Sequence, residues 1–257
     1  MKALFRWLAL VATAILALQL FFVARIAMMA VVAPQSTAFE RSEAWRIVVD
    51  KGHLPWRQQW VPYTRISDNL KRAVIASEDD GFSNHDGVDW DALEKAWQKN
   101  AKAQDKVDAQ AARAQVQASK KTGAAPAKGK TPKPPKVVGG STITQQLAKN
   151  LFLSGERTLL RKGQEFVLTL LLEALLSKER ILEIYLNSVE WGEGVFGAEA
   201  AAQHYFRKPA ARLTPFEAAR LAVMLPRPKY FEKLPNSEYL AHRASVIVGR
   251  LQNAELP

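Results

Sequence analysis

Residues 73–87 read AVIASEDDGFSNHDG, and the rest of the chain is organised around this stretch. Side chains that can pack recur before and within it at the spacing of one helix face, at Leu70, Ala73, Val74 and Ser77. Ser67 is expected to cap that helix, with Asp68 in its first turn. The helix should end at Glu78, because two aspartates and Gly81 follow and favour a turn. The pattern predicts a carboxylate at a helix-to-loop junction, where it can serve as a general base; a surface acidic turn is the alternative.

Residues 139–153 form a second distinctive stretch and read GGSTITQQLAKNLFL. Ser141 is expected to cap a helix whose apolar residues face inward, at Ile143, Leu147 and Leu151. Another face of this helix then carries a hydroxyl, an amide and a cation, from Thr142, Gln145 and Lys149. Such a face suits an anionic or sugar ligand, although a solvated helix face has the same pattern.

A third segment begins at Arg161 and continues as the long apolar helix 166–176. One face of this otherwise leucine-rich helix is polar, because side chains at i, i+3 and i+7 lie on the same face: Lys162, Glu165 and Thr169. A polar line on so apolar a helix indicates a side that faces a cleft.

Helix signals continue to the C-terminus. Ser177 is expected to cap one helix, and Thr214 begins another as part of a capping box with proline at the first helical position. Between them, residues 191–197 form a glycine-punctuated loop, and we interpret the nearby His204 as structural. Helical periodicity dominates and no strand pairs are evident, so the predicted fold class is mainly α.

Two segments carry weaker signals. The short apolar run Ile47-Val48-Val49 is either a strand or part of a segment that leads into the domain. Trp90, Leu93 and Trp97 lie at helical spacing, so they predict an amphipathic helix from about Asp89 whose tryptophans belong to the core.

The composition limits the classes of protein that the chain can form. Its 257 residues, 48% of them apolar, allow one sizeable core and an appendage. The chain has no cysteine, which excludes disulfides and thiolate metal sites, and its four histidines show no metal-ligand spacing. The net charge is +11, but residues 99–136 contribute ten basic and two acidic residues, or +8, which leaves +3 elsewhere. Because the basic charge is local, nucleic-acid binding is not expected.

Residues Trp7 to Ala24 are eighteen uncharged, mostly apolar residues. As a helix they would span roughly 27 Å, close to the hydrocarbon thickness of a bilayer. Lys2 and Arg6 precede them and favour a cytoplasmic N-terminus. The apolar run is too long for a cleaved signal peptide, so we expect one uncleaved transmembrane anchor.

The motifs in 73–87 and 139–153, in this order, resemble those of the membrane-bound peptidoglycan glycosyltransferases. The resemblance is to the monofunctional biosynthetic form of family 51, whose module also occurs in class A penicillin-binding proteins. It runs from about Ser67 to about Pro235, and residues 161–165 match the family's Arg-Lys-x-x-Glu motif. It implies a lysozyme-like helical lobe beside a smaller lobe that abuts the membrane.

The resemblance also implies a reaction. In such enzymes lipid-linked disaccharide-pentapeptide (lipid II) is polymerised into glycan strands, with inversion at the anomeric carbon and release of undecaprenyl diphosphate. The implied catalytic residues are Glu78, as general base, and Glu165. The implied substrate-binding residues are Asp79, Ser141, Thr142, Gln145, Lys149, Asn150, Arg157 and Lys162.

The diphosphate leaving group is anionic, so Lys149, Arg157 and Lys162 fit charge stabilisation. Glu165 would orient these cations or help to hold a divalent ion, Mg²⁺ or Mn²⁺, which is the one cofactor considered. The expected partners are lipid II, the growing glycan strand, the membrane and other proteins of cell-wall synthesis and division. The expected location is the inner (cytoplasmic) membrane, crossed once, with the catalytic domain on the periplasmic side.

The predicted organisation has three parts. These are an anchor (1–33), a connecting segment (34–66) and a glycosyltransferase domain (67–257). The domain departs from the family pattern at residues 100–136, a low-complexity basic insertion of Ala, Lys, Gln and Pro between the two motifs.

Two other functions stay open. A lytic or hydrolytic enzyme of the wall polymer would also use a glutamate on a helical lobe, but it needs no cationic diphosphate site. A non-catalytic, membrane-anchored wall scaffold would be expected to have lost one of the key residues, yet all four are present: Glu78, Lys149, Arg157 and Glu165.

Overall fold

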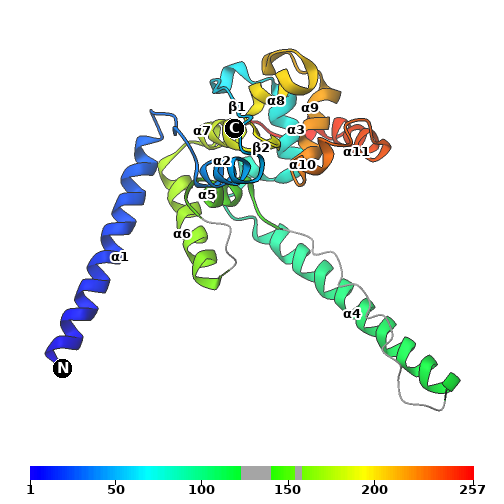
Figure 1. Cartoon of the computed structure of the whole chain (residues 1–257), viewed down its shortest axis with the longest axis horizontal. Coiled ribbons are helices and arrows are strands. Elements are labelled where there is room, and N and C mark those ends of the chain that lie inside the picture. The colour runs from blue at the N-terminus through cyan, green and yellow to red at the C-terminus, as the bar shows by residue number, and fades with distance from the viewer. Residues whose placement is uncertain (123–139, 154–157) are drawn as a thin grey trace. The chain divides into compact units, whose positions relative to one another are not determined.

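The computed structural model describes residues 1–122, 140–153 and 158–257, and for residues 114–122 it describes the backbone alone. The chain divides into two units, residues 1–88 with 142–257 and residues 89–141. Figure 1 labels the helices of the larger unit: α1 (Lys2–Met28), α2 (Ala38–Lys51), α3 (Asp68–Glu78), α5 (Ile143–Phe152), α6 (Leu159–Leu175), α7 (Lys178–Ser188), α8 (Ala198–Phe206), α9 (Pro215–Met224), α10 (Pro228–Phe231) and α11 (Glu238–Val248). The smaller unit contains α4 (Trp90–Thr122). The mainly α prediction is confirmed.

The helix α3 lies at the centre of the larger unit. The Ser67 hydroxyl accepts a hydrogen bond from the Leu70 amide at 3.2 Å and caps the helix as predicted. Leu70, Ala73 and Val74 are fully buried, and α3 packs against α9, which in turn packs against α11. The helix ends at Glu78, so this carboxylate is carried by one of the best-packed elements of the fold.

The helix α5 carries the second motif and begins one residue later than expected. Its N-cap is Thr142 and not Ser141, because the Thr142 hydroxyl accepts the hydrogen bond from the Gln145 amide. Ser141 is exposed and belongs to the smaller unit. The predicted inward face is confirmed, since Ile143, Leu147 and Leu151 are buried. This face packs α5 against α6 and α7, and α2 also contacts α5.

A three-stranded sheet contradicts the expectation that no strands pair. Its strands are β1 (Arg57–Gln58), β2 (Glu190–Gly192) and β3 (Val195–Phe196), in the order β1-β3-β2. The first pair is parallel, with Arg57 opposite Val195, and the second is antiparallel. Strands of two or three residues are too short for a period-two pattern to appear in the sequence.

The run Ile47-Val48-Val49 is helical, so its interpretation as a strand is wrong. It lies in α2, where Ile47 is fully buried while Val49 is 64% exposed. A capping box begins α2, because the Thr37 hydroxyl accepts from the Glu40 amide and the Glu40 carboxylate accepts from the Thr37 amide. Gly52 ends it in the left-handed conformation that glycine favours, with φ at 72°.

The tryptophans of α4 are not core residues, although the helix begins at Trp90, close to the predicted position. Trp90 is 64% exposed, Leu93 43% and Trp97 76%. The described part of the smaller unit is one long helix with few other large apolar side chains, which gives these residues little to pack against. The helix includes residues 100–122 of the insertion, whereas 123–136 lie outside the described residues.

The helix α1 matches the predicted anchor. It has 27 residues with a mean hydropathy of 2.3 over its most apolar window. Within the described part of the chain, it is the one helix long and apolar enough to cross a membrane.

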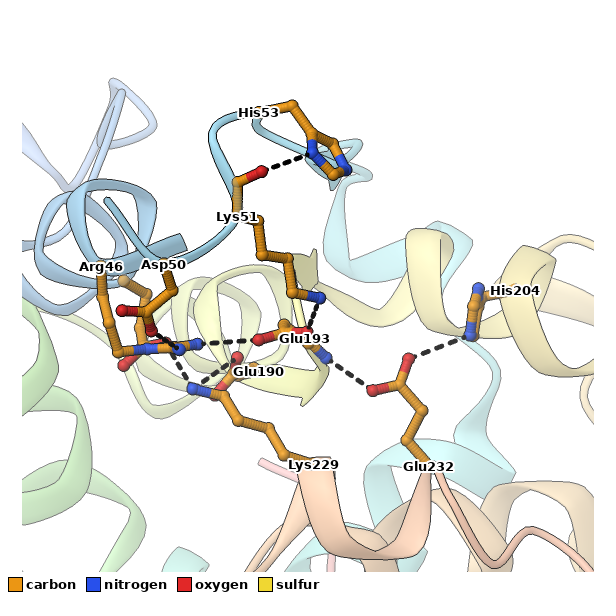
Figure 2. A network of polar contacts seen from close by, with 10 residues as sticks. Arg46, Asp50, Lys51, His53, Glu190, Glu193, His204, Lys229 and Glu232 are labelled. Atoms are coloured by element: carbon orange, nitrogen blue, oxygen red, sulfur yellow. Dashed lines mark hydrogen bonds and ion pairs between the residues drawn. The ribbon is translucent and has the colours of Figure 1, made fainter. Parts of the chain in front are cut away.

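Charged side chains fasten the end of α2 to the sheet (Figure 2). Arg46 pairs with Asp50 at 2.9 Å and with Glu193 at 3.2 Å, and Lys51 pairs with the same Glu193. Beside them, Lys229 of α10 lies 3.5 Å from the buried carboxylate of Glu190 in β2. These contacts hold α2 against the β2–β3 turn, and α2 contacts the site helix α5.

The Glu190 carboxyl should make stability depend on pH. Burial raises its pKa to about 7, Glu43 adds to the rise, and Lys229 and Arg46 oppose it. The folded state therefore binds this proton more tightly than the unfolded state, and the resulting stability is lost as the pH rises from about 4.5 to about 7. Relative to Glu190→Gln, the parent should lose on the order of 3 kcal/mol of unfolding free energy across this range. Denaturant unfolding of both proteins at several pH values measures the difference, and parallel curves would contradict the prediction.

Candidate active site

The Glu78 carboxylate is held by a chain of hydrogen bonds from α5 and α7. The Gln146 side-chain amide donates to it at 3.1 Å, and the Gln146 carbonyl accepts from the Tyr185 hydroxyl at 3.0 Å. Burial raises the pKa of Glu78 above its usual range and the Asp79 charge adds to this, while hydrogen bonds from Gln146 and Ser77 oppose the rise. A half-buried, oriented carboxylate with a raised pKa is suited to accept a proton near neutral pH.

The neighbouring Asp79 ties the Glu78 loop to α5. Asp79 is 7% exposed, and one of its carboxylate oxygens accepts from the Ile143 amide in the first turn of α5 at 2.9 Å. The other lies 2.8 Å from Nε2 of His85. Because the Gly87 amide donates to Nδ1 of that ring at 3.1 Å, Nε2 carries the proton and donates to Asp79. Both oxygens of Asp79 therefore have protein partners; its role in substrate binding stays a prediction.

The polar groups of Thr142 and Gln145 serve the start of α5. Their capping box uses the Thr142 hydroxyl as the acceptor for the Gln145 amide and the Gln145 side chain as the acceptor for the Thr142 amide, both at 3.2 Å. The Thr142 hydroxyl also donates to the Gly87 carbonyl at 2.7 Å. These contacts position the helix, and the prediction that the two residues bind substrate is untested.

Gly87 is required where the loop meets α6. Its φ is +86°, a conformation that side chains with a Cβ rarely adopt. A Cβ there would also come within 2.8 Å of side-chain atoms of Thr169 and Glu173. Close approach of the loop to α6 therefore depends on glycine at this position.

Glu173 joins three helices next to this loop, and it is not among the residues predicted from the sequence. Its Oε1 accepts from the Thr144 hydroxyl at 2.6 Å and from the Lys178 ammonium at 2.8 Å. The Lys178 ammonium also donates to the His85 carbonyl at 2.5 Å and lies 4.6 Å from the centre of the Phe82 ring. The Glu78 loop is thereby fixed to α5, α6 and α7.

Lys149 lies in the last turn of α5, and Asn150 follows it, half-buried. Desolvation of the ammonium lowers the pKa of Lys149, and the charges of Arg161 and Lys162 act in the same direction, whereas Glu165 opposes them. The structure therefore places Lys149 of α5 close enough to Lys162 and Glu165 of α6 for their charges to change its pKa. Arg157 lies outside the described residues.

Glu165 is 4% exposed and is occupied by cations of its own helix. It pairs with Lys162 and, at 3.3 Å, with Arg161. Among residues 1–122, 140–153 and 158–257, no group of three or more His, Asp or Glu side chains could hold a metal ion. These residues do not fit a divalent-cation site made by the protein alone. Its ion pairs place Glu165 beside both cations, and its predicted roles, orienting them or helping to hold a divalent ion, stay predictions.

Arg161 is a further candidate, beyond the site residues predicted from the sequence. Its guanidinium is mostly buried, and within the described part of the chain its Nε has no hydrogen-bond partner. A buried donor without a partner is costly, and an anion in the site would satisfy it. In the sequence, the one indication of this role is that Arg161 directly precedes the predicted site residue Lys162.

Gln146 was also missed, and its effect on Glu78 can be tested. Gln146→Leu removes a hydrogen bond that lowers the pKa of Glu78, so that pKa should rise further. If Glu78 must be ionised, the acid limb of the kcat/KM profile should move to higher pH, with the largest loss of activity at low pH. Gln203→Leu on α8 is the control, because Gln203 bonds only locally to Glu199. An acid limb at the parent's position would argue against Glu78 as the titrating base.

The chain is similar in sequence to known transglycosylases. A family model described as Transglycosylase matches residues 49–123 and 119–252. The chain is 53% identical to the biosynthetic peptidoglycan transglycosylase of Burkholderia thailandensis over 98% of this chain and 88% of that relative. It is 50% identical to the protein of the same name from Paraburkholderia xenovorans, over 98% of this chain and 94% of the relative. The Burkholderia pseudomallei relative is 51% identical, over 98% and 88% respectively.

Proposed function

The chain belongs to the transglycosylase family and is a peptidoglycan glycosyltransferase, and on this premise we propose that it polymerises lipid II with release of undecaprenyl diphosphate. The observation that carries the proposal is the pairing of two features in one unit. A half-buried carboxylate, Glu78, is oriented by α5, and the same helix carries a cation, Lys149, that is electrostatically coupled to Arg161 and Lys162 of α6. Transfer from a diphosphate-linked sugar needs both a base and an anion site.

In the proposed reaction, a sugar hydroxyl attacks the anomeric carbon that carries the diphosphate. The hydroxyl proton passes to the Glu78 carboxylate as the new C–O bond forms. The bond from the anomeric carbon to the diphosphate breaks, and its electron pair leaves with the phosphate oxygen. Lys149, Arg161 and Lys162 would stabilise that developing charge, with Arg157 as a further cation on the family's pattern. Direct attack of this kind inverts the anomeric centre.

Glu165 would keep two of these cations in place through its ion pairs. A carboxylate that is itself buried and paired limits the number of orientations that Lys162 and Arg161 can take, which favours preorganisation. The divalent ion that Glu165 would help to hold stays a prediction, and the described residues do not form a cluster of three protein ligands for it.

The proposed location follows from α1 and its flanking charges. The 27-residue apolar helix α1 has Lys2 as its first residue, and this supports a single-pass anchor with a cytoplasmic N-terminus, in line with the charge distribution typical of such helices. The catalytic domain would then lie on the outer side of the cytoplasmic membrane, where a lipid-linked precursor can reach it.

Product analysis tests this function against hydrolysis of the wall polymer. The full-length protein is incubated in vesicles with purified lipid II, and the products are separated into polymer and short sugars. The proposal expects polymer that a glycan-cleaving enzyme degrades, together with released undecaprenyl diphosphate. Free disaccharide without polymer would favour the hydrolytic alternative, and an absence of turnover would favour a scaffold.

A further inference from the structure

The end of α1 is built into the core of the catalytic domain. Ile26 is fully buried and Met29 is 4% exposed, and both belong to the main apolar cluster. The Phe22 ring meets the Phe152 ring of α5 edge-on at 5.3 Å, and the Arg25 guanidinium lies 5.5 Å from the centre of the same ring. The anchor therefore has a fixed position relative to α5.

A second contact joins α1 to α6, farther from the C-terminal end of α1. The side-chain amides of Gln19 and Gln164, 145 residues apart, bond reciprocally: each Nε2 donates to the other's Oε1, at 3.1 Å and 3.3 Å. Gln19 lies nine residues before the end of α1, or roughly 14 Å along the helix axis. It is therefore within the apolar span, where an amide without a partner would be costly.

The direction of α6 follows from a second pair of contacts. Gln164, near the start of α6, lies beside Gln19, whereas Arg180, in the first turn of α7 beyond the end of α6, donates to the carbonyl of Met29 at 2.7 Å. The two helices consequently run in the same direction, as Figure 1 shows them side by side. Residues of α6 that precede Gln164 must then lie level with the middle of α1.

The surface of α6 suits that depth. Leu159 and Leu160, which precede Gln164, are 93% and 87% exposed, and Phe166, Val167 and Leu170 are also exposed. Large side chains exposed to this extent are costly in water but not in hydrocarbon. Because α1 beside it also exposes large apolar side chains, lipid is the environment that fits this face.

We propose that Gln19 and Gln164 form a polar clasp within the membrane that holds α6 beside the anchor. Gln164 lies two residues after Lys162 and directly before Glu165, so the clasp would set the height of the α6 cations relative to the bilayer. A diphosphate attached to a membrane lipid has a fixed depth, so a change in the height of α6 would change how its cations meet that diphosphate. Gln19 and Gln164 are positioning residues, since neither meets the reacting atoms. This inference rests on the proposed membrane location and lipid-linked substrate.

Cross-linking tests the contact itself. The chain has no cysteine, so a Gln19→Cys, Gln164→Cys pair introduces the only two thiols. In full-length protein reconstituted into vesicles, oxidation should join them, which is detected as a shift in gel mobility. The control pair Thr13→Cys, Gln164→Cys should not react, because Thr13 lies six residues, or roughly 9 Å, farther along α1. No cross-link in the Gln19 pair, or equal cross-linking in both pairs, would overturn the clasp.

Kinetics test the positioning role. Gln19→Leu and Gln164→Leu should each raise the apparent KM for lipid II roughly 3- to 15-fold, the range expected for hydrogen bonds inside membranes, with little change in kcat. The double variant should be no worse than either single variant, because no unpaired amide remains. Thr13→Val is the matched control, since the Thr13 hydroxyl donates to the Ala9 carbonyl of its own helix.

The outcomes separate the clasp from simpler explanations. A loss of kcat with an unchanged KM would mean that the variants only reduce the amount of folded enzyme, and it would overturn the positioning role. Unchanged kinetics despite a cross-link would overturn it as well. Cross-linking of the Gln19→Cys, Gln164→Cys variant, together with a parent protein that makes no polymer, would refute the proposed function and leave the helix contact standing.

Discussion

Glu78→Gln should abolish polymerisation while the protein stays folded. The amide keeps the shape of the carboxylate, and its carbonyl can still accept the hydrogen bond from Gln146, but it cannot take a proton from the attacking hydroxyl. General bases contribute about 10²- to 10⁴-fold, so kcat should fall by that order. The pKa of Glu78 is raised in the folded state, which means that its charge is unfavourable there at neutral pH. The variant should therefore melt at the parent's temperature or above.

The matched control for this variant is Asp80→Asn, two residues farther along the same loop. Asp80 is exposed, so removing its charge should leave turnover within about twofold of the parent. Polymer formation by both variants is followed with lipid II in vesicles, alongside thermal unfolding. Near-normal turnover by Glu78→Gln would remove Glu78 from the role of base, and an equal loss in Asp80→Asn would indicate a general effect of negative charge.

Lys149→Ala is expected to cause the second-largest loss. Its side chain is exposed at the end of α5, and the charges of Arg161, Lys162 and Glu165 on α6 act on its ammonium, so an anion bound beside these cations can reach it. Removing one preorganised group of this kind costs on the order of 10²-fold in kcat. Lys149→Arg should recover part of the loss, because it restores the charge but not the size of the group.

Lys233→Ala provides the comparison for Lys149. Lys233 is an exposed lysine after α10, and its removal changes the net charge by the same amount. Steady-state rates are measured at two salt concentrations. Salt strongly screens the long-range attraction between the substrate and the net charge of the protein, but it weakens a direct ion pair with the diphosphate much less. Similar losses in Lys149→Ala and Lys233→Ala would contradict a localised diphosphate site.

Most of the helical framework could be predicted because its signals are local. The caps Ser67, Ser177 and Thr214 accept hydrogen bonds from amides three residues ahead, as their sequence positions indicate. The strands could not be predicted in this way, since β1 is two residues long and pairs with β3, more than 130 residues away. Such pairing depends on tertiary packing. The capping box of Thr37 and Glu40, in contrast, was present in the sequence and identifies α2.

In the candidate site, too, the features set by local sequence could be predicted and those set by tertiary contacts could not. The position of Glu78 at a helix end followed from residues adjacent to it, and the inward face of α5 followed from periodicity. Which of the two neighbouring glutamines contacts Glu78 depends on the face of α5 that each occupies. Gln146 lies three residues after the buried Ile143 and donates to Glu78. Gln145 instead completes the capping box. Contacts between distant segments, such as Tyr185 with Gln146, leave no trace in a single sequence.

The most direct test of the central claim is the stereochemistry of the bond that the enzyme forms. NMR of the polymer made from isotopically labelled lipid II gives the configuration of the new glycosidic linkage, which is compared with that of the precursor's anomeric carbon. Direct attack by a hydroxyl, with Glu78 as base and the diphosphate leaving from the opposite face, predicts inversion in every newly formed bond. Retention of configuration would require a covalent glycosyl-enzyme intermediate and would contradict the assignment of Glu78 as a general base.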